Sequence, residues 1–109
     1  IKPIKVSHGS VQSICYIVDK KLAYISDVSK IFKKDFRYFR NLKYLIIDCL
    51  WYKKHMSHFN LEKSLEMINL FSPKKAILTN LHTDLDYDEL KKKLPKNVIP
   101  AHDGLTVNL

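Results

Sequence analysis

Histidines and aspartates follow several apolar runs of this sequence, and these are residue types that bind metal ions. A short apolar run at residues 4–7 leads to His8, and the run LAYIS at residues 22–26 leads to Asp27. Chemistry in α/β sheets collects just beyond the strand ends, where loops bring distant residues together. Imidazole and carboxylate together suit zinc, manganese or iron. The candidate side chains are His8, Asp27, Asp48, His55, His58, Asn80, His82 and Asp84.

Each candidate also has a simpler interpretation. A single histidine after a strand is often a surface residue, and His102 is interpreted in this way. Asp27 could cap a helix that begins at Val28, because aspartate is a common N-cap residue. Asp48, within a buried run, could accept hydrogen bonds from loop amides. Since the sequence contains no HxH or HExxH motif, spacing alone does not establish a metal site.

Short strands alternating with helices must position these residues. Apolar residues recur at helical spacing from Val28 to Phe39, Asn60 is a candidate N-cap, and Asp86 with Glu89 forms a capping box for a last helix. The expected strands cover residues 4–7, 11–18, 22–26, 43–50, 75–79, 98–99 and 105–107. A hairpin turn is expected at residues 19–21. This order predicts a single α/β domain, a sheet covered by helices.

Composition excludes several classes of protein. The chain has 109 residues, 46% of them hydrophobic, and no apolar run approaches the roughly 20 residues that cross a bilayer. A disordered chain, a membrane protein and a disulfide-rich secreted domain are therefore not expected. Cys15 and Cys49 lie in apolar runs without CxxC spacing, which indicates buried free thiols in a reducing cytoplasm.

The net charge of +8 has two interpretations. Only Arg37 and Arg40 among the 19 basic residues are arginine, and nucleic-acid sites usually recruit arginine. Together with many Ile and Asn residues, the lysines are equally well explained by codon bias in an AT-rich genome. An RNA-binding helical face with Lys33, Lys34, Arg37 and Arg40 beside Tyr38 is the alternative.

Five ordered blocks of the sequence resemble the C-terminal half of metallo-β-lactamase-fold hydrolases. The blocks are His8-Gly9, LAYISDV (22–28), IDCL (47–50) with HMSH (55–58), ILTNLHTDLDY (77–87) and Asp103-Gly104-Leu105. They look most similar to the phosphodiesterase branch, which includes phosphoribosyl cyclic phosphodiesterase and relatives of the tRNA 3′-processing ribonuclease. The resemblance implies half of an αββα sandwich, with a mixed β-sheet and about three helices, over residues 1–109.

The resemblance also implies roles for individual residues. His8 looks like a metal ligand, Asp27 like the carboxylate that bridges two divalent ions (Zn or Mn), and His82 like the last histidine ligand. His58 looks like the histidine that contacts the scissile phosphate and acts as general acid, while the ions hold the attacking hydroxide. Asp48, His55, Asn80 and Asp84 are supporting candidates. Many relatives have histidine at the position of Asn80, so His82, two residues later on the same face of an extended segment, takes that role here.

The signature of this fold, a His-x-His-x-Asp-His loop in the N-terminal half, does not occur in the sequence. The sequence also begins at Ile1, so we expect either a trimmed start or the tail of a longer gene product. The remaining ligands are fewer than the three or four that each ion normally needs, and the isolated chain is expected to be inactive or nearly so.

Three functions therefore remain open. The first is part of a metal-dependent phosphodiesterase that acts on a small phosphodiester, completed by an N-terminal half. The second is a non-catalytic remnant or a self-associating module, because half of a sandwich exposes an apolar sheet face. The third is RNA binding.

Overall fold

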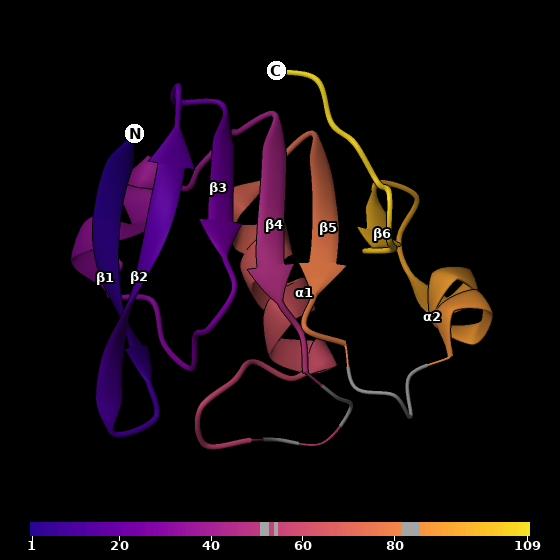
Figure 1. The fold of residues 1–109 in the computed structure, drawn as a ribbon, viewed down its shortest axis with the longest axis horizontal. Helices are drawn as coiled ribbons and strands as arrows, with labels where there is room; N and C mark the ends of the chain where they lie inside the picture. The colour runs from indigo at the N-terminus through magenta and orange to yellow at the C-terminus, as the bar shows by residue number, and fades with distance from the viewer. Residues whose placement is uncertain (51–52, 54, 82–85) are drawn as a thin grey trace.

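The computed structural model describes residues 1–50, 53, 55–81 and 86–109 as one six-stranded sheet with helices packed against it (Figure 1). The elements in chain order are β1 (Lys2–His8), β2 (Val11–Val18), β3 (Leu22–Ile25), the 3₁₀-helix η1 (Lys33–Tyr38), β4 (Tyr44–Asp48), α1 (Leu61–Phe71), β5 (Lys75–Thr79), α2 (Tyr87–Lys93) and β6 (Val98–Pro100). Among the described residues, no helix is both long and apolar enough to cross a membrane.

The strands lie side by side in sequence order, which keeps every connection short. β1, β2 and β3 are antiparallel neighbours, whereas β3, β4, β5 and β6 run parallel. Parallel strands need crossover connections, and η1, α1 and α2 lie in the three crossovers. Because β3, β4 and β5 are parallel, their carboxyl ends meet at one edge of the sheet, as Figure 1 shows.

The core lies between the sheet and the helices η1 and α1, which sit behind the sheet in Figure 1. Alternate residues of each strand face this core, so buried apolar residues recur at every second position. The aromatic ring of Phe71 on α1 contacts those of Phe36 (5.3 Å between centroids) and Phe39 (5.4 Å). The side chains on the core face of the sheet include Ile4, Val6, Cys15, Ile17, Ala23, Ile25, Leu45, Ile47, Ala76 and Leu78, all buried.

Local signals place the two α-helices where the sequence predicts them. The side chain of Asn60 accepts a hydrogen bond from the Lys63 N–H (2.9 Å), and Ser72 ends the helix in the left-handed conformation before Pro73. Asp86 caps α2 by accepting from the Asp88 N–H (3.0 Å). Asp19 and Lys20 adopt positive φ angles in the predicted hairpin turn.

Two predicted elements are wrong. The amphipathic helix expected from Val28 to Phe39 is only the 3₁₀-helix Lys33–Tyr38. Its first residues instead pair with the edge of β1, because the Ser7 N–H donates to the Lys30 carbonyl (3.0 Å) and the Ser29 N–H to the Ser7 carbonyl (2.8 Å). The strand expected at residues 105–107 is a non-repetitive tail that follows a turn closed by the Leu105 N–H and the His102 carbonyl.

Candidate metal centre

Three of the predicted residues converge at the carboxyl edge of the sheet. His8 is the last residue of β1, Asp27 lies two residues beyond β3, and His58 lies two residues before the N-cap of α1. Each offers one ligand atom, and the three atoms lie within 4.8 Å of one another. Among the described residues, this is the single group of three or more such side chains. The donor set of two imidazoles and a carboxylate fits a divalent transition-metal ion.

The ring orientation of His8 is fixed by the backbone of the loop before α1. Its Nδ1 lies 2.6 Å from the Ser57 carbonyl oxygen. A carbonyl can only accept, so Nδ1 carries the hydrogen and the lone pair is on Nε2. This arrangement is typical of metal-binding histidines, whose second nitrogen donates to a carbonyl or carboxylate.

A tight turn after His8 packs against the same loop. Gly9 has a φ of +64°, and a Cβ added there would collide with the Ser57 hydroxyl. The Gly9 N–H donates to the Ser29 hydroxyl (3.1 Å), which in turn donates to the Ser7 carbonyl (3.3 Å). The backbone angle favours glycine here, and any side chain at this position would also require the Ser57 hydroxyl to move.

Asp48 is a buried carboxylate that ties together the ends of three strands. Its Oδ2 accepts from the Val28 N–H (3.0 Å) and contacts His58 Nδ1 (2.7 Å), while Oδ1 lies 3.5 Å from the Asn80 amide nitrogen. Burial raises the pKa of Asp48, and the hydrogen bonds from Val28, His58 and Asn80 oppose this rise. The carboxylate therefore holds His58 directly and Asp27 through its neighbour Val28.

Asn80 braces the site rather than facing the cluster. Its φ is +59°, and its side-chain amide donates to the Ser26 carbonyl as well as to Asp48. Asn80, at the end of β5, is thereby linked to the ends of β3 and β4.

The remaining candidates lie around or outside the cluster. His55 is exposed, and its ring centroid is 5.3 Å from that of His58. His102 is exposed beside Tyr87, as expected for a surface residue. His82 and Asp84 lie outside the described residues. A cavity of about 180 Å³ opens next to His58, lined by Ser29, His55, His58, Phe59, Asn60 and Lys63.

Sequence reasoning missed the backbone partners of the site. The Ser57 carbonyl and the Val28 N–H have no sequence signal, because every residue except proline carries both groups. The buried hydroxyl of Ser64 also escaped notice, although it donates to the Asp48 carbonyl (2.5 Å). The sequence signal for this bond is that Ser64 lies among the apolar residues of the helix, where a hydroxyl needs a hydrogen-bond partner.

Solved structures share this arrangement of elements. A diphosphatase of the PhnP family superposes with a TM-score of 0.94 and 30% identity over 98% of this chain. The metallo-β-lactamase fold protein YhfI from Bacillus subtilis has a TM-score of 0.74 and 20% identity over 94%. The short form of human tRNase Z (ELAC1) has a TM-score of 0.71 and 13% identity over 97%. The chain has the fold of half a metallo-β-lactamase domain.

This half-domain spans 42% of the diphosphatase chain, 46% of YhfI and 41% of the tRNase Z. No family model and no curated protein sequence matches it. The resemblance predicted from the five sequence blocks and the predicted α/β fold are confirmed. The neighbours include hydrolases, and the metallo-β-lactamase half-domain presents a His-Asp-His group where a divalent ion fits.

Proposed function

We propose that this half-domain supplies part of the active site of a metal-dependent phosphodiesterase that acts on a small phosphodiester. The observation that carries the proposal is the His8, Asp27 and His58 cluster at the carboxyl edge of the sheet. The bonds that orient both imidazoles support it, because the Ser57 carbonyl fixes His8 and the buried Asp48 carboxylate fixes His58.

His8 and Asp27 are the proposed metal ligands, and His82 remains a proposed further ligand. His8 is suited to this role because its Nδ1–H is used by the Ser57 carbonyl, leaving Nε2 as the donor atom. Divalent ions, zinc or manganese, when bound would supply Lewis-acid polarisation of the phosphoryl group and a nucleophile at neutral pH.

His58 is the proposed general acid. The Asp48 carboxylate holds its Nδ1, so that Nε2 is the nitrogen available to donate a hydrogen bond to a phosphoryl oxygen or a proton to the leaving alkoxide. The cavity beside His58 and the N-terminus of α1 would receive an anionic group.

The site needs further ligands from outside these residues. Two ions with three or four protein ligands each need more donors than this cluster provides. We therefore propose that a complementary part of the fold, or a second copy, completes the centre, and that the half-domain alone is inactive or nearly so. A purely structural or self-associating module is the alternative.

Metal binding and hydrolysis, measured separately, test the proposal. Co-expressed with the complementary part of a PhnP-family diphosphatase, the half-domain should bind cobalt(II) and give absorption in the visible d–d bands, and Asp27→Ala should weaken this binding. His102→Ala, which removes an exposed histidine outside the cluster, is the matched control and should bind as the parent chain does. Hydrolysis of bis-p-nitrophenyl phosphate should arise on co-expression with the complementary part of a PhnP-family diphosphatase.

Two results would overturn parts of this proposal. Cobalt binding that Asp27→Ala leaves unchanged would show that the cluster is not the metal centre, and would favour the non-catalytic alternative. Metal binding without any gain of hydrolysis in the complemented complex would contradict the phosphodiesterase assignment alone.

A further inference from the structure

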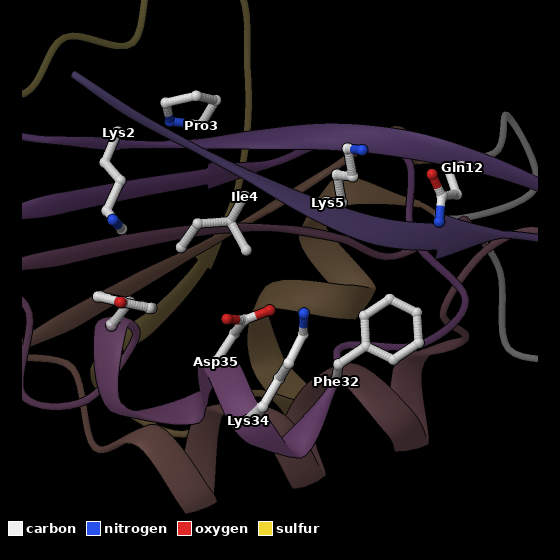
Figure 2. Close-up of a pocket in the computed structure, with 9 residues that line it drawn as sticks. Lys2, Pro3, Ile4, Lys5, Gln12, Phe32, Lys34 and Asp35 are labelled. Atoms are coloured by element: carbon white, nitrogen blue, oxygen red, sulfur yellow. The ribbon is translucent and has the colours of Figure 1, made fainter.

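A groove runs between the edge strand β1 and the helix η1, on the part of β1 that precedes His8. Its volume is about 430 Å³, and Figure 2 shows the side chains that line it. Ile4 points from β1 into the groove, and Asp35 and Lys34 point toward β1 from η1. Phe32 closes the opposite end from Lys2, whose amine points toward η1.

Cations gather around Tyr38 at the Lys2 end of this groove. The Lys2 Nζ lies 4.6 Å and the Arg37 Cζ 4.5 Å from the centre of the Tyr38 ring. The guanidinium of Arg37 also donates to the Tyr38 hydroxyl (2.7 Å) and to the Lys34 carbonyl (2.9 Å). Lys2 and Arg37 are thus held by an aromatic ring, and in the described part of the chain neither forms an ion pair with a carboxylate.

A second cavity of about 590 Å³ shares Lys2 and Tyr38 with the first, so the two cavities form one continuous strip of the surface. It adds Lys20, Arg37 and Arg40, with Asp19 as its acidic residue. The cations that line the two cavities are Lys2, Lys5, Lys20, Lys34, Arg37 and Arg40, against the carboxylates Asp19 and Asp35. Of these, Lys5 points away from η1 in Figure 2. An excess of cations over carboxylates attracts a ligand that carries several negative charges.

The edge of β1 is unsuited to an added peptide strand. The backbone N–H and carbonyl of Ser7 point away from β2, since they bond with Lys30 and Ser29. The two-residue period of a strand puts Pro3 and Lys5 on the same outer edge. Pro3 has no N–H to donate, and lysines discourage strand pairing at an edge. The ligand of this groove must therefore be recognised by side-chain charge rather than by a β-ladder.

We propose that this strip, which we name the Tyr38 groove, binds single-stranded nucleic acid through its phosphates. Regularly spaced phosphates match cations distributed along two adjoining cavities, as in sequence-tolerant single-strand grooves. Lys2 and Arg37 contact the Tyr38 ring, so the ring positions the cations, and recognition depends on the backbone more than on base stacking. This goes beyond the proposed hydrolytic function and does not depend on it.

Fluorescence anisotropy with a labelled oligouridylate of about twelve nucleotides tests the proposal. The parent half-domain should bind at about 50 mM salt, and the affinity should fall with salt, with a slope of about −2 to −4 in log–log form. The triple variant Lys34→Ala, Arg37→Ala, Arg40→Ala should lose at least tenfold in affinity, and its slope should be shallower by about 2.

The matched control removes the same charge elsewhere. Lys91→Ala, Lys92→Ala, Lys96→Ala takes three exposed lysines from α2 and the segment before β6, at the opposite edge of the sheet, and should stay within about twofold of the parent. Circular dichroism should show that both variants are folded.

Three results would overturn the proposal. Equal losses in the two triple variants would show that net charge, rather than the Tyr38 groove, attracts the strand. Absence of binding at about 50 mM salt would exclude nucleic acid as the ligand. Displacement of the oligonucleotide by equimolar pyrophosphate would assign the groove to a small polyphosphate.

Discussion

At the scale of single residues, the candidate centre is organised by hydrogen bonds to groups that are not ligands. The Ser57 carbonyl orients His8, and Asp48 orients His58. His8 and Asp27 could be selected from the sequence because they follow strands and match a known pattern. Ser57 could not, since its contribution is a backbone carbonyl whose position depends on how the loop before α1 folds.

Gly9→Ala is expected to weaken metal binding. An alanine at a φ of +64° is strained, and its Cβ would push against Ser57, whose carbonyl orients His8. We expect cobalt affinity to fall by about tenfold or more, the size of effect seen when an outer-shell partner is lost. Gly104→Ala is the control, because Gly104 also has a positive φ (+81°) but a Cβ there meets nothing within 4 Å. Equal losses in both variants would indicate general destabilisation instead.

Asp48→Asn tests the role of the buried carboxylate. The amide keeps the shape but replaces the carboxylate that holds His58 Nδ1 with a neutral group. In the complemented complex we expect kcat to fall by about 10²-fold or more, because general acid catalysis contributes about this factor. Cobalt binding should change much less, which distinguishes loss of the acid from loss of the centre. An unchanged kcat would show that His58 acts without this carboxylate.

Both thiols should be inert in the folded protein. Burial raises the pKa of Cys15 and of Cys49 to about 12. At pH 8 the thiolate fraction is then roughly 10⁻⁴, so a thiol-disulfide reagent has almost no nucleophile to attack it. We expect no reaction with Ellman's reagent until the chain unfolds in guanidinium, and immediate reaction in a Lys91→Cys control. Rapid labelling of the parent chain would contradict this.

At the scale of elements, the sequence predicts those with local signals and fails where tertiary pairing decides. α1 begins at its predicted cap, Asn60, and the hairpin between β2 and β3 forms at its predicted turn. Residues 28–39 have helical spacing, yet only Lys33–Tyr38 is helical. Ser29 and Lys30 pair with Ser7 instead, a long-range choice that the local pattern does not contain.

An aromatic cluster of Phe36, Phe39 and Phe71 packs α1 against η1 behind the sheet. The substitution Phe71→Ala tests how much this cluster contributes to stability. Phe71 on α1 is fully buried against Phe36 and Phe39. Its truncation should lower the free energy of unfolding by about 3–5 kcal/mol through lost burial and a cavity. Leu70→Ala, one residue earlier but 42% exposed, should change it by about 0.5 kcal/mol or less. Urea unfolding of the two variants measures the difference.

At the scale of the whole molecule, one face of the sheet has helices and the other has none among the described residues (Figure 1). The register places Tyr16, Tyr24, Ile46, Ile77 and Ile99 in one row across that second face. Tyr16 and Tyr24 are 43% and 42% exposed. Ile46 and Ile99 are half-buried and Ile77 is buried, so the part of the row that is open to solvent is the tyrosine pair on β2 and β3. Exposed aromatic side chains on a sheet face without helices mark a surface suited to association with other protein.

The half-domain alone should therefore self-associate through this face. Tyr24→Lys places a charge in the exposed part of the row, and desolvating this charge would oppose association. We expect light scattering to give a mass of at least twice 12.8 kDa for the parent and a substantially lower mean mass for Tyr24→Lys at the same concentration. Leu70→Lys is matched in exposure, at 42%, but lies on α1 behind the sheet and should leave the mass unchanged.

A monomeric parent that binds no hydrophobic dye would show that this face is stable when exposed to solvent and would contradict the prediction. If Leu70→Lys lowered the mass as much as Tyr24→Lys, association would depend on general apolar exposure rather than on this row of residues.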